Sequence, residues 1–559
     1  EFAKVAQRIE TLTQVLRCLR KYSPPQRFDN SQIHDLLRHF AVLLTCGRKG
    51  DIDAKRVTAV TGKLTAEGRL HTMAITQNPF SPQSFVSRLG VDQVIKTNKG
   101  FEEVINGDRD AESLSVHIGD LWAAFASCDP AKDPQAPAKL LNFVISRSFR
   151  KLRARLQFGE WRCKERLSNK IQQWQPAGSN INPRWVNVPL WLKECVSQFP
   201  SVIMKHRVRI GEDGREVLQW EFSDETRKLW ATVLATMLSE LRQAVEKAHR
   251  IRTRSYSRAR PSKEERDAIS NVSLWSYNLF SYIYWEEGIV QTLLTETDLA
   301  DAMLDENSSS KEGDKNILTT ADPAEYEGKE VEMHLQGNIH GGPRDQLLRY
   351  LQALVAWPGA VNSLLADGFC TLSDDLSVGL VKVQPCILPL CSAKEMMNEY
   401  VRSRDANTGN PNLRLQLENT FKKYCSRAFY RTVHAEATLM GLVSYLASSN
   451  DARVNYGEPI PADDLRILQD IIDSDATEIG IAVGKDCCWC CNRLAYHLSA
   501  HLNKNFKLAG THGIIYGWKP PRVGIPVSVL KLLEDDLWVE LVEALRVPPR
   551  PRGFRQNSG

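Results

Sequence analysis

The sequence predicts a mixed α/β protein in which a mostly α-helical N-terminal region precedes a three-layer α/β/α domain. Through residues 1–297, apolar residues recur at three- and four-residue steps, as amphipathic helices require. Residues 298–335 are mainly acidic and polar, and in residues 336–546 helical segments alternate with short apolar strands. Such alternation is typical of a sheet covered by helices. We therefore expect a helical region of unknown role, a linker, an α/β domain and a basic, proline-rich tail at residues 547–559.

The N-terminal region is expected to form successive helices, with no repeat of fixed period. Helical spacing of apolar residues occurs at residues 2–19, 33–44 and 229–245. Aromatic residues join the pattern between 273 and 294, which predicts a helix buried on most sides. Residues 305–330 are rich in Asp, Glu, Ser, Lys and Gly and poor in apolar side chains, so we expect a solvated loop or a disordered linker there.

In the C-terminal domain, short runs of β-branched and other apolar residues predict strands at 378–383, 478–483 and 513–518. The expected helices cover residues 347–357, residues 359–365, a segment that opens at His434, a segment from the cysteines at 487–491 toward Leu502, and residues 527–545.

Two short segments of this domain carry side chains that bind metals. His434-Ala435-Glu436 opens a predicted helix, and the run from Cys487 to Cys491 follows a predicted strand and turn. A hydrolytic zinc site needs three protein ligands, an open fourth position for water and a nearby proton carrier. A His-x-Glu followed by Cys-x-x-Cys supplies this set, with Glu436 as the carboxylate that need not be a ligand. The zinc deaminases of bases and nucleosides use such an arrangement.

The cysteine run admits two registers, because residues three apart lie on one face of a helix. Cys488 and Cys491 share an apolar stripe of the predicted helix, whereas Cys487 and Cys490 lie on a more polar stripe. A metal between helices and a sheet needs ligands on the buried stripe. The helix dipole also favours thiolates at the helix N-terminus. We therefore expect His434, Cys488 and Cys491 to bind zinc.

Two other interpretations of the cysteines stay open. A structural zinc site would use four ligands, either all of the cysteines or His497 as well, and would leave Glu436 without a role. A thioredoxin-like redox pair would leave both His434 and Glu436 without one.

These segments resemble the deaminase domain that is expanded in fungi, which belongs to the zinc-dependent cytidine-deaminase-like superfamily. The resemblance rests on three blocks and covers about residues 336–546. It implies a central mixed sheet of about five strands with both metal-bearing helices on one face. It also implies that His434, Cys488 and Cys491 are the ligands and that Glu436 is the acid and base. Cys487 stands where the usual Pro-Cys-x-x-Cys signature has proline. The three blocks are His434–Glu436, Ile479–Lys485 leading into Cys488–Cys491, and Gly510–Trp518.

Three side chains near the expected pocket are candidates for contacts with the substrate. His512 precedes a predicted strand at the rim of that pocket, although a polar loop residue is the simpler interpretation. Trp489 and Trp518 could stack on a base, because every base offers a π-face, or could equally belong to the core.

A basic run in the N-terminal region is a candidate contact for nucleic acid. Arginines interleaved with a tyrosine could bind phosphates and stack a base, whereas a solvated loop between helices is the simpler interpretation. A second basic helix, at residues 147–155, could join the run as one patch. The run comprises Arg250, Arg252, Arg254, Tyr256, Arg258 and Arg260.

The composition, with 42% hydrophobic and 25% charged residues in a chain of 559, fits an ordinary folded protein. A formal net charge of +5 is too small on this length to indicate a nucleic-acid partner by itself. No apolar run of about 18 residues occurs, so we expect no membrane partner. The 13 cysteines cluster only at 487–491, which favours a reducing intracellular compartment, cytoplasmic or nuclear. The chain begins Glu1-Phe2 without an initiator Met or a signal peptide, so the numbering is expected to start inside a longer chain.

The leading hypothesis is a zinc-dependent hydrolytic deaminase of cytosine or adenine, acting on nucleic acid or on a free nucleoside or nucleotide. It would use zinc-activated hydroxide and Glu436 as a proton shuttle. The alternative is a catalytically silent zinc-fold module whose helical N-terminal region is a scaffold for protein partners.

Overall fold

The chain divides into two compact units that do not follow the order of the sequence. The first unit comprises Glu1–Ala41, Arg56–Gln93 and Ser373–Gly559, and the second comprises Val42–Lys55 and Val94–Leu372. The computed structural model describes residues 1–19, 26–27, 32–46, 57–78, 89–110, 113–162, 166–178, 181–199, 204–210, 216–254, 260–303, 343–366, 372–383, 390–404, 411–425, 432–449, 452–484 and 486–546.

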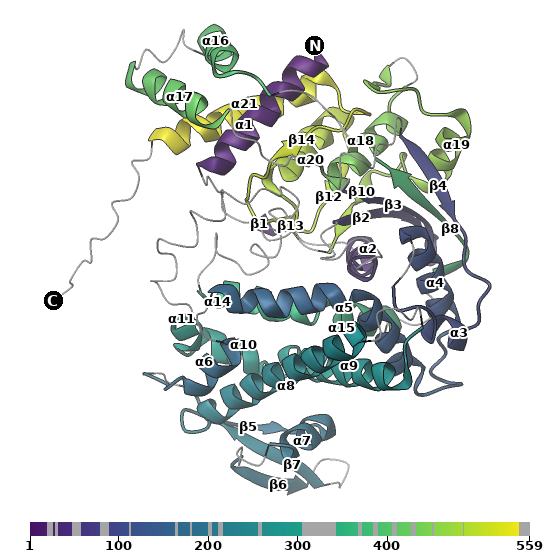
Figure 1. The fold of residues 1–559 in the computed structure, drawn as a ribbon, viewed down its shortest axis with the longest axis vertical. Helices are drawn as coiled ribbons and strands as arrows, with labels where there is room; N and C mark the ends of the chain where they lie inside the picture. Colours follow the sequence, from purple (N-terminus) through teal and green to yellow (C-terminus); the bar gives the residue numbers. More distant parts are fainter. Residues whose placement is uncertain are drawn as a thin grey trace, which may run out of the picture. The chain divides into compact units, whose positions relative to one another are not determined.

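A five-stranded sheet with the order β11-β2-β3-β8-β4 forms the core of the first unit (Figure 1). An antiparallel hairpin at its centre pairs Thr58 with Gln77 and Val60 with Ile75. Strand β2 is buried on both faces over its first five residues, as expected for a sheet covered on both sides. The strands are β2 (Thr58–Leu64), β3 (Leu70–Gln77), β4 (Gly90–Val94), β8 (Leu372–Lys382) and β11 (Ala482–Val483).

Short strand pairs lead from this sheet to the segments that hold the metal-binding side chains. β10 (Glu478–Gly480) runs through Ile481 into β11 and pairs in parallel with β12 (Asn505–Lys507). β9 (Thr432–Val433) ends immediately before His434 and pairs in parallel with β14 (Trp518–Lys519). The last pair is antiparallel and joins β1 (Gln26–Arg27) to β13 (Gly510–Thr511).

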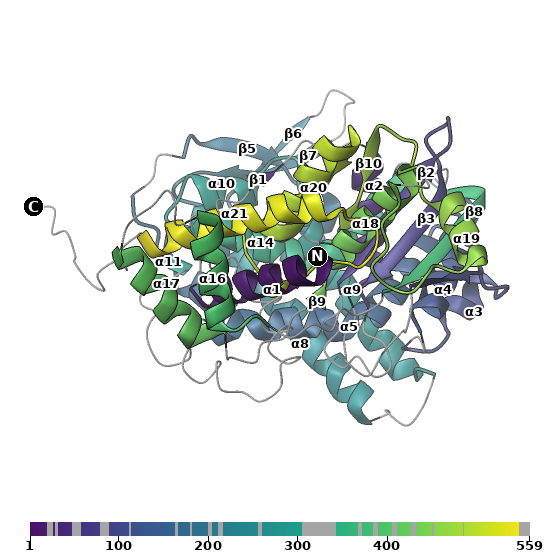
Figure 2. The same cartoon turned by 90° about the horizontal axis from the view of Figure 1, so that it is seen from above.

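Helices cover the sheet of the first unit (Figures 1 and 2). α18 packs on β2 and β3, and α20 packs on α18 and β12. α1 packs against α21 and β14, and α2 lies against Gly480 in β10. The helices are α1 (Phe2–Cys18), α2 (Gln32–Leu43), α16 (Ala393–Arg404), α17 (Pro411–Tyr424), α18 (Ala435–Ala447), α19 (Ala462–Ile471), α20 (Trp489–Leu502) and α21 (Val527–Arg546).

A close approach between two backbones fixes the position of α18. A Cβ atom on Gly441 would lie 2.4 Å from the carbonyl oxygen of Val523, so this helix position has room only for hydrogen. Gly524 has φ of +73°, and a Cβ atom there would lie 1.6 Å from the carbonyl oxygen of Gly441. Glycine is the residue that tolerates both the left-handed backbone and this contact.

The second unit is mainly helical. Of its longest helices, α9 packs against both α5 and α8. An antiparallel sheet with the order β5-β7-β6 is formed by strands that lie between α5 and α8 in the sequence. Its elements are α3 (Phe101–Ile105), α4 (Leu114–Ser127), α5 (Ala136–Arg162), α6 (Leu167–Gln173), β5 (Arg184–Asn187), α7 (Leu190–Ser197), β6 (His206–Ile210), β7 (Glu216–Phe222), α8 (Arg227–Arg254), α9 (Lys263–Ile283), α10 (Ile289–Thr295), α11 (Leu299–Met303), α14 (Pro343–Leu354) and α15 (Ala356–Ala366).

The expected domain boundaries differ from this division. Residues 1–297 do not form one helical region, because α1 and the hairpin β2–β3 belong to the first unit, whereas residues 343–366 belong to the second. Periodicity reports which local segment is helical but carries no information on distant pairing, so the boundaries were drawn along the sequence. Of the expected linker at 298–335, α11 is a helix, and residues 304–335 lie outside the described part, as does the tail at 547–559.

Most expected helices of the C-terminal part occur, but one expected strand does not. The segment 513–518 is largely irregular, with the two-residue strands β13 and β14 on either side of it. The expected helix at 273–294 is interrupted, because α9 ends at Ile283 and Gly288 caps α10 with a left-handed backbone of φ +63°.

Within the described residues, no helix is long and apolar enough to cross a membrane.

Candidate metal centre

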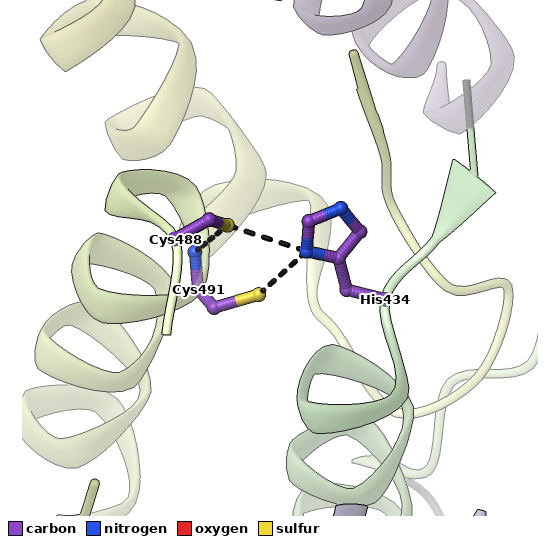
Figure 3. Close-up of side chains that lie close together, drawn as sticks. All are labelled: His434, Cys488 and Cys491. Carbon is purple, nitrogen blue, oxygen red and sulfur yellow. Dashed lines mark hydrogen bonds between the residues drawn. The ribbon is translucent and has the colours of Figure 1, made fainter. Parts of the chain in front are cut away.

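The two metal-binding segments meet at the N-terminal ends of two neighbouring helices. His434 is the N-cap residue of α18, and Cys488 is the N-cap residue of α20. Both have an extended backbone, and the Sγ atom of Cys488 accepts a hydrogen bond of 3.3 Å from the backbone N–H of Cys491 in the first turn of α20. Because α20 packs on α18, the two caps face each other (Figure 3).

His434, Cys488 and Cys491 have the geometry of a metal site. The Nδ1 atom of His434 lies 3.3 Å from Sγ of Cys488 and 3.5 Å from Sγ of Cys491. All three donor atoms lie within 4.8 Å of one another, and all three side chains are buried. In a tetrahedral zinc site, bond lengths of about 2.0–2.1 Å to nitrogen and 2.3 Å to sulfur separate these atoms by about 3.5–3.6 Å. The residues present therefore fit a zinc ion.

The charge balance of the thiols also favours a cation. Burial opposes ionisation of Cys488, but hydrogen bonds from Cys490 and Cys491 and the charge of His434 outweigh it, so the pKa of Cys488 lies well below its ordinary value. Burial, together with the neighbouring Cys488, raises the pKa of Cys491 well above its ordinary value. A bound cation reverses this second effect, because metal coordination deprotonates a thiol.

Cys487 and Cys490 are buried but do not belong to this group of donor atoms. Cys487 is held by its backbone: its N–H donates to the carbonyl of Gly510, and its own carbonyl accepts from the N–H of His512. This ladder fixes which cysteines reach His434, so the geometry favours the pair Cys488 and Cys491.

Glu436 lies in the first turn of α18 and is 2% exposed. Burial and the neighbouring Cys488 raise the pKa of both Cys487 and Cys491, and the negative charge of Glu436 adds to this effect. Glu436 is not one of the three grouped donor residues. A buried carboxylate beside a metal site and outside its ligand set is suited to proton transfer.

No role at this site was predicted from the sequence for two residues, Asn78 and Tyr516. The Oδ1 atom of Asn78 accepts a hydrogen bond of 2.7 Å from the backbone N–H of Ala435, the residue between His434 and Glu436. The ring of Tyr516 lies 6.1 Å from that of His434. Asn78 follows β3 and is 357 residues away from Ala435, so no local pattern links the two. Tyr516 occupies the irregular segment that was expected to be a strand.

The three candidates for substrate contact fall in different environments. His512 is partly exposed, its Nδ1 accepts from the N–H of Ile514, and its ring meets that of Tyr516 edge-on at 5.4 Å. Trp489 is 6% exposed at the start of α20. Trp518 is fully buried, so it is a core residue and offers no face to a base.

His497 does not join the metal group. Its Nε2 atom lies 2.7 Å from Oδ2 of Asp536, which also accepts from Arg493, so His497 links α20 to α21. Among the described residues, the group of candidate donors has three members and provides no fourth ligand for a structural site.

The basic run is not a single exposed patch. Arg250, Arg252 and Arg254 lie in the last turns of α8, while Tyr256 and Arg258 lie outside the described residues and Arg260 is exposed after them. Arg252 is buried, forms ion pairs with Glu265 at 3.4 Å and Asp110 at 3.7 Å, and donates to the carbonyl of Ser146. Arg252 therefore stabilises the interior of the second unit and is not a surface contact for phosphate.

No protein-family model, no curated protein and no solved structure matches this chain. The assignment of a function therefore depends on the geometry of the His434, Cys488 and Cys491 group.

Proposed function

We propose that the protein is a zinc-dependent hydrolytic deaminase of a nucleobase, cytosine or adenine. The observation that carries the proposal is the buried group of one imidazole and two thiols, with a buried glutamate beside it that is not a ligand. A structural zinc site closes its coordination with four protein ligands and has no use for such a carboxylate.

Zinc is the ion that this donor set favours. One imidazole nitrogen and two thiolates match the borderline-soft ligands of zinc, and three protein ligands leave one tetrahedral position for a water molecule. Bound there, zinc would act as a Lewis acid that makes this water a nucleophile at neutral pH.

Glu436 is the residue that we assign to proton transfer. Deamination replaces the exocyclic amine of the base by an oxygen from water and releases ammonia, so protons must move from the water to a ring nitrogen and to the leaving amine. Glu436 is the second residue of α18, two positions after the cap residue His434, and its buried carboxylate can accept and return these protons. Its burial excludes bulk water from the transfer.

The fold supports this proposal at a coarser level. A mixed α/β unit with a five-stranded sheet brings two helix N-termini, α18 and α20, to one place. The resemblance to the cytidine-deaminase-like superfamily implies two metal-bearing helices on one face of a sheet, and the meeting of these helix ends supports the proposal. Here the hairpin β2–β3 comes from the N-terminal part of the chain.

The test is to incubate zinc-loaded protein with single-stranded DNA, single-stranded RNA, and free nucleosides and nucleotides of cytosine and adenine. Base conversion and ammonia release are then measured. We expect turnover of at least one of these substrates, and turnover lower by about 10²–10⁴-fold with Glu436→Ala. Zinc binding without turnover of any substrate would instead favour the alternative, a catalytically silent zinc module.

A further inference from the structure

A pocket of about 190 Å³ lies in the second unit between α3, α5 and α9. It shares no residue with the group of His434, Cys488 and Cys491. Its floor is formed by the buried residues Arg147, Phe143 and Ile269. Its rim includes the exposed residues Arg266 and Ser270. A ligand can therefore enter from solvent and reach a buried guanidinium.

Cations and hydrogen-bond donors dominate the lining. Three basic side chains, Arg147, Lys139 and Arg266, line the pocket together with one acidic side chain, Asp108. The amide of Asn142 and the hydroxyl groups of two serines add neutral donors. Such a set is complementary to an anion with several oxygens, since guanidinium groups bind phosphate with paired hydrogen bonds.

Arg147 is the residue that points to a missing ligand. It is 3% exposed, and its Nη2 atom donates to Asp120 at 2.9 Å. Its Nε and Nη1 atoms make no hydrogen bond with any residue in the described part of the chain. A buried donor left without a hydrogen-bond partner destabilises the folded protein, and more so when the group is charged. Asp120 also forms an ion pair with Lys99 at 3.7 Å, so its negative charge is shared between Lys99 and Arg147.

We propose that this pocket is a binding site for a phosphate group, with Arg147 at its floor and Lys139 and Arg266 at its rim. The volume holds a phosphate with a small substituent, and it is below the roughly 300–1,000 Å³ of pockets for drug-sized ligands. The site is independent of the proposed deaminase activity, because all of its residues belong to the second unit.

Lys139 already contacts Glu102 at 2.6 Å and Asp133 at 2.9 Å, so an entering phosphate competes with these carboxylates for its ammonium group. Arg266 has its Nη1 atom on the carbonyl of Pro261, a neutral acceptor. Arg147 and Arg266 therefore supply most of the expected affinity.

The test is calorimetric titration of the full chain with inorganic phosphate against chloride at equal ionic strength. We expect saturable binding of phosphate to the wild type. Arg147→Gln and Arg266→Gln are expected to weaken it by about tenfold or more, since hydrogen bonds to charged groups contribute at that level. The matched control is Lys132→Gln, which removes a lysine that is 86% exposed and outside the pocket lining, and should leave the affinity unchanged.

Asp108→Asn should change the affinity for phosphate in the opposite direction to the two arginine substitutions. Removing the acidic side chain from the lining should tighten phosphate binding, which loss of folding cannot imitate. Arg266 and Asp108 are exposed, so these variants keep the test valid if Arg147→Gln leaves Asp120 without its cation and fails to fold.

A single-stranded oligonucleotide added as competitor distinguishes the two sources of phosphate. Displacement of inorganic phosphate by the oligonucleotide identifies a nucleic-acid backbone, and no displacement identifies a free small phosphate ester. Absence of saturable binding up to about 10 mM phosphate would overturn the proposal. Equal affinity of the wild type, Arg266→Gln and Asp108→Asn would overturn it as well.

Discussion

Glu436 is the residue on which the proposed chemistry depends. Because it is buried in the first turn of α18 and is not among the grouped donor residues, its removal should leave the metal in place. We expect Glu436→Ala to keep zinc and fold while losing deamination by about 10²–10⁴-fold, the usual contribution of a general acid or base. Zinc is measured by elemental analysis and turnover by ammonia release. Turnover by Glu436→Ala at the rate of the wild type would rule out the proposed role of Glu436 in proton transfer.

The choice between adjacent cysteines is also decided at the level of single residues. The Sγ atoms of Cys488 and Cys491 lie 3.3 Å and 3.5 Å from Nδ1 of His434, whereas Cys487 and Cys490 are outside this group of candidate metal ligands. Cys488→Ala and Cys491→Ala should therefore lose stoichiometric zinc. Cys487→Ala and Cys490→Ala are the matched controls, because they remove a thiol that is equally buried. Zinc loss in the controls, with zinc kept in Cys488→Ala, would show that the register is wrong by one residue.

At the scale of elements, Asn78 connects the end of β3 to the start of α18. Its Oδ1 accepts from the N–H of Ala435, one of the first helical N–H groups, which have no partner inside the helix. Asn78→Ala should lower the free energy of unfolding by about 1 kcal/mol, as for a lost helix cap. Urea denaturation of the zinc-loaded protein measures this change. Asn271→Ala, at an exposed position of α9, is the control and should change stability by less than about 0.5 kcal/mol.

The elements show which parts of the fold local sequence could predict. Amphipathic spacing predicted α1, α18 and α21. The buried residues of α21 follow this period along one face, whereas α18 is buried on all sides from Ala435 to Ser444. The group of His434, Cys488 and Cys491 was predicted from the His-x-Glu and Cys-x-x-Cys segments, with the cysteine register chosen from the apolar stripe of the predicted helix. The hairpin β2–β3 was not foreseen, because β2 is buried on both faces and has no alternation of polar and apolar residues. Asn78 and Tyr516 reach the site only through pairing of distant segments.

The whole molecule consists of two units with separate cores. In the sequence, most of the second unit is inserted between strands β4 and β8 of the first. A hairpin at residues 58–77 and a strand at 482–483 then share one sheet. Multidomain chains of this kind do not unfold in a single two-state transition. Two calorimetric transitions are therefore expected, one for each unit.

Zinc removal should affect only one of these transitions. All three grouped donor residues belong to the first unit, so a bound ion stabilises that unit by roughly 4 kcal/mol when free zinc is about 1,000 times its Kd. Adding a chelator should lower the Tm of one transition by several degrees and leave the other unchanged. Leu234→Ala, a fully buried position in α8, assigns the second transition, because this substitution costs about 2–5 kcal/mol in the core of the second unit alone. If chelation shifted the transition that Leu234→Ala also shifts, the metal would stabilise the second unit, and a metal centre confined to the first unit would be excluded.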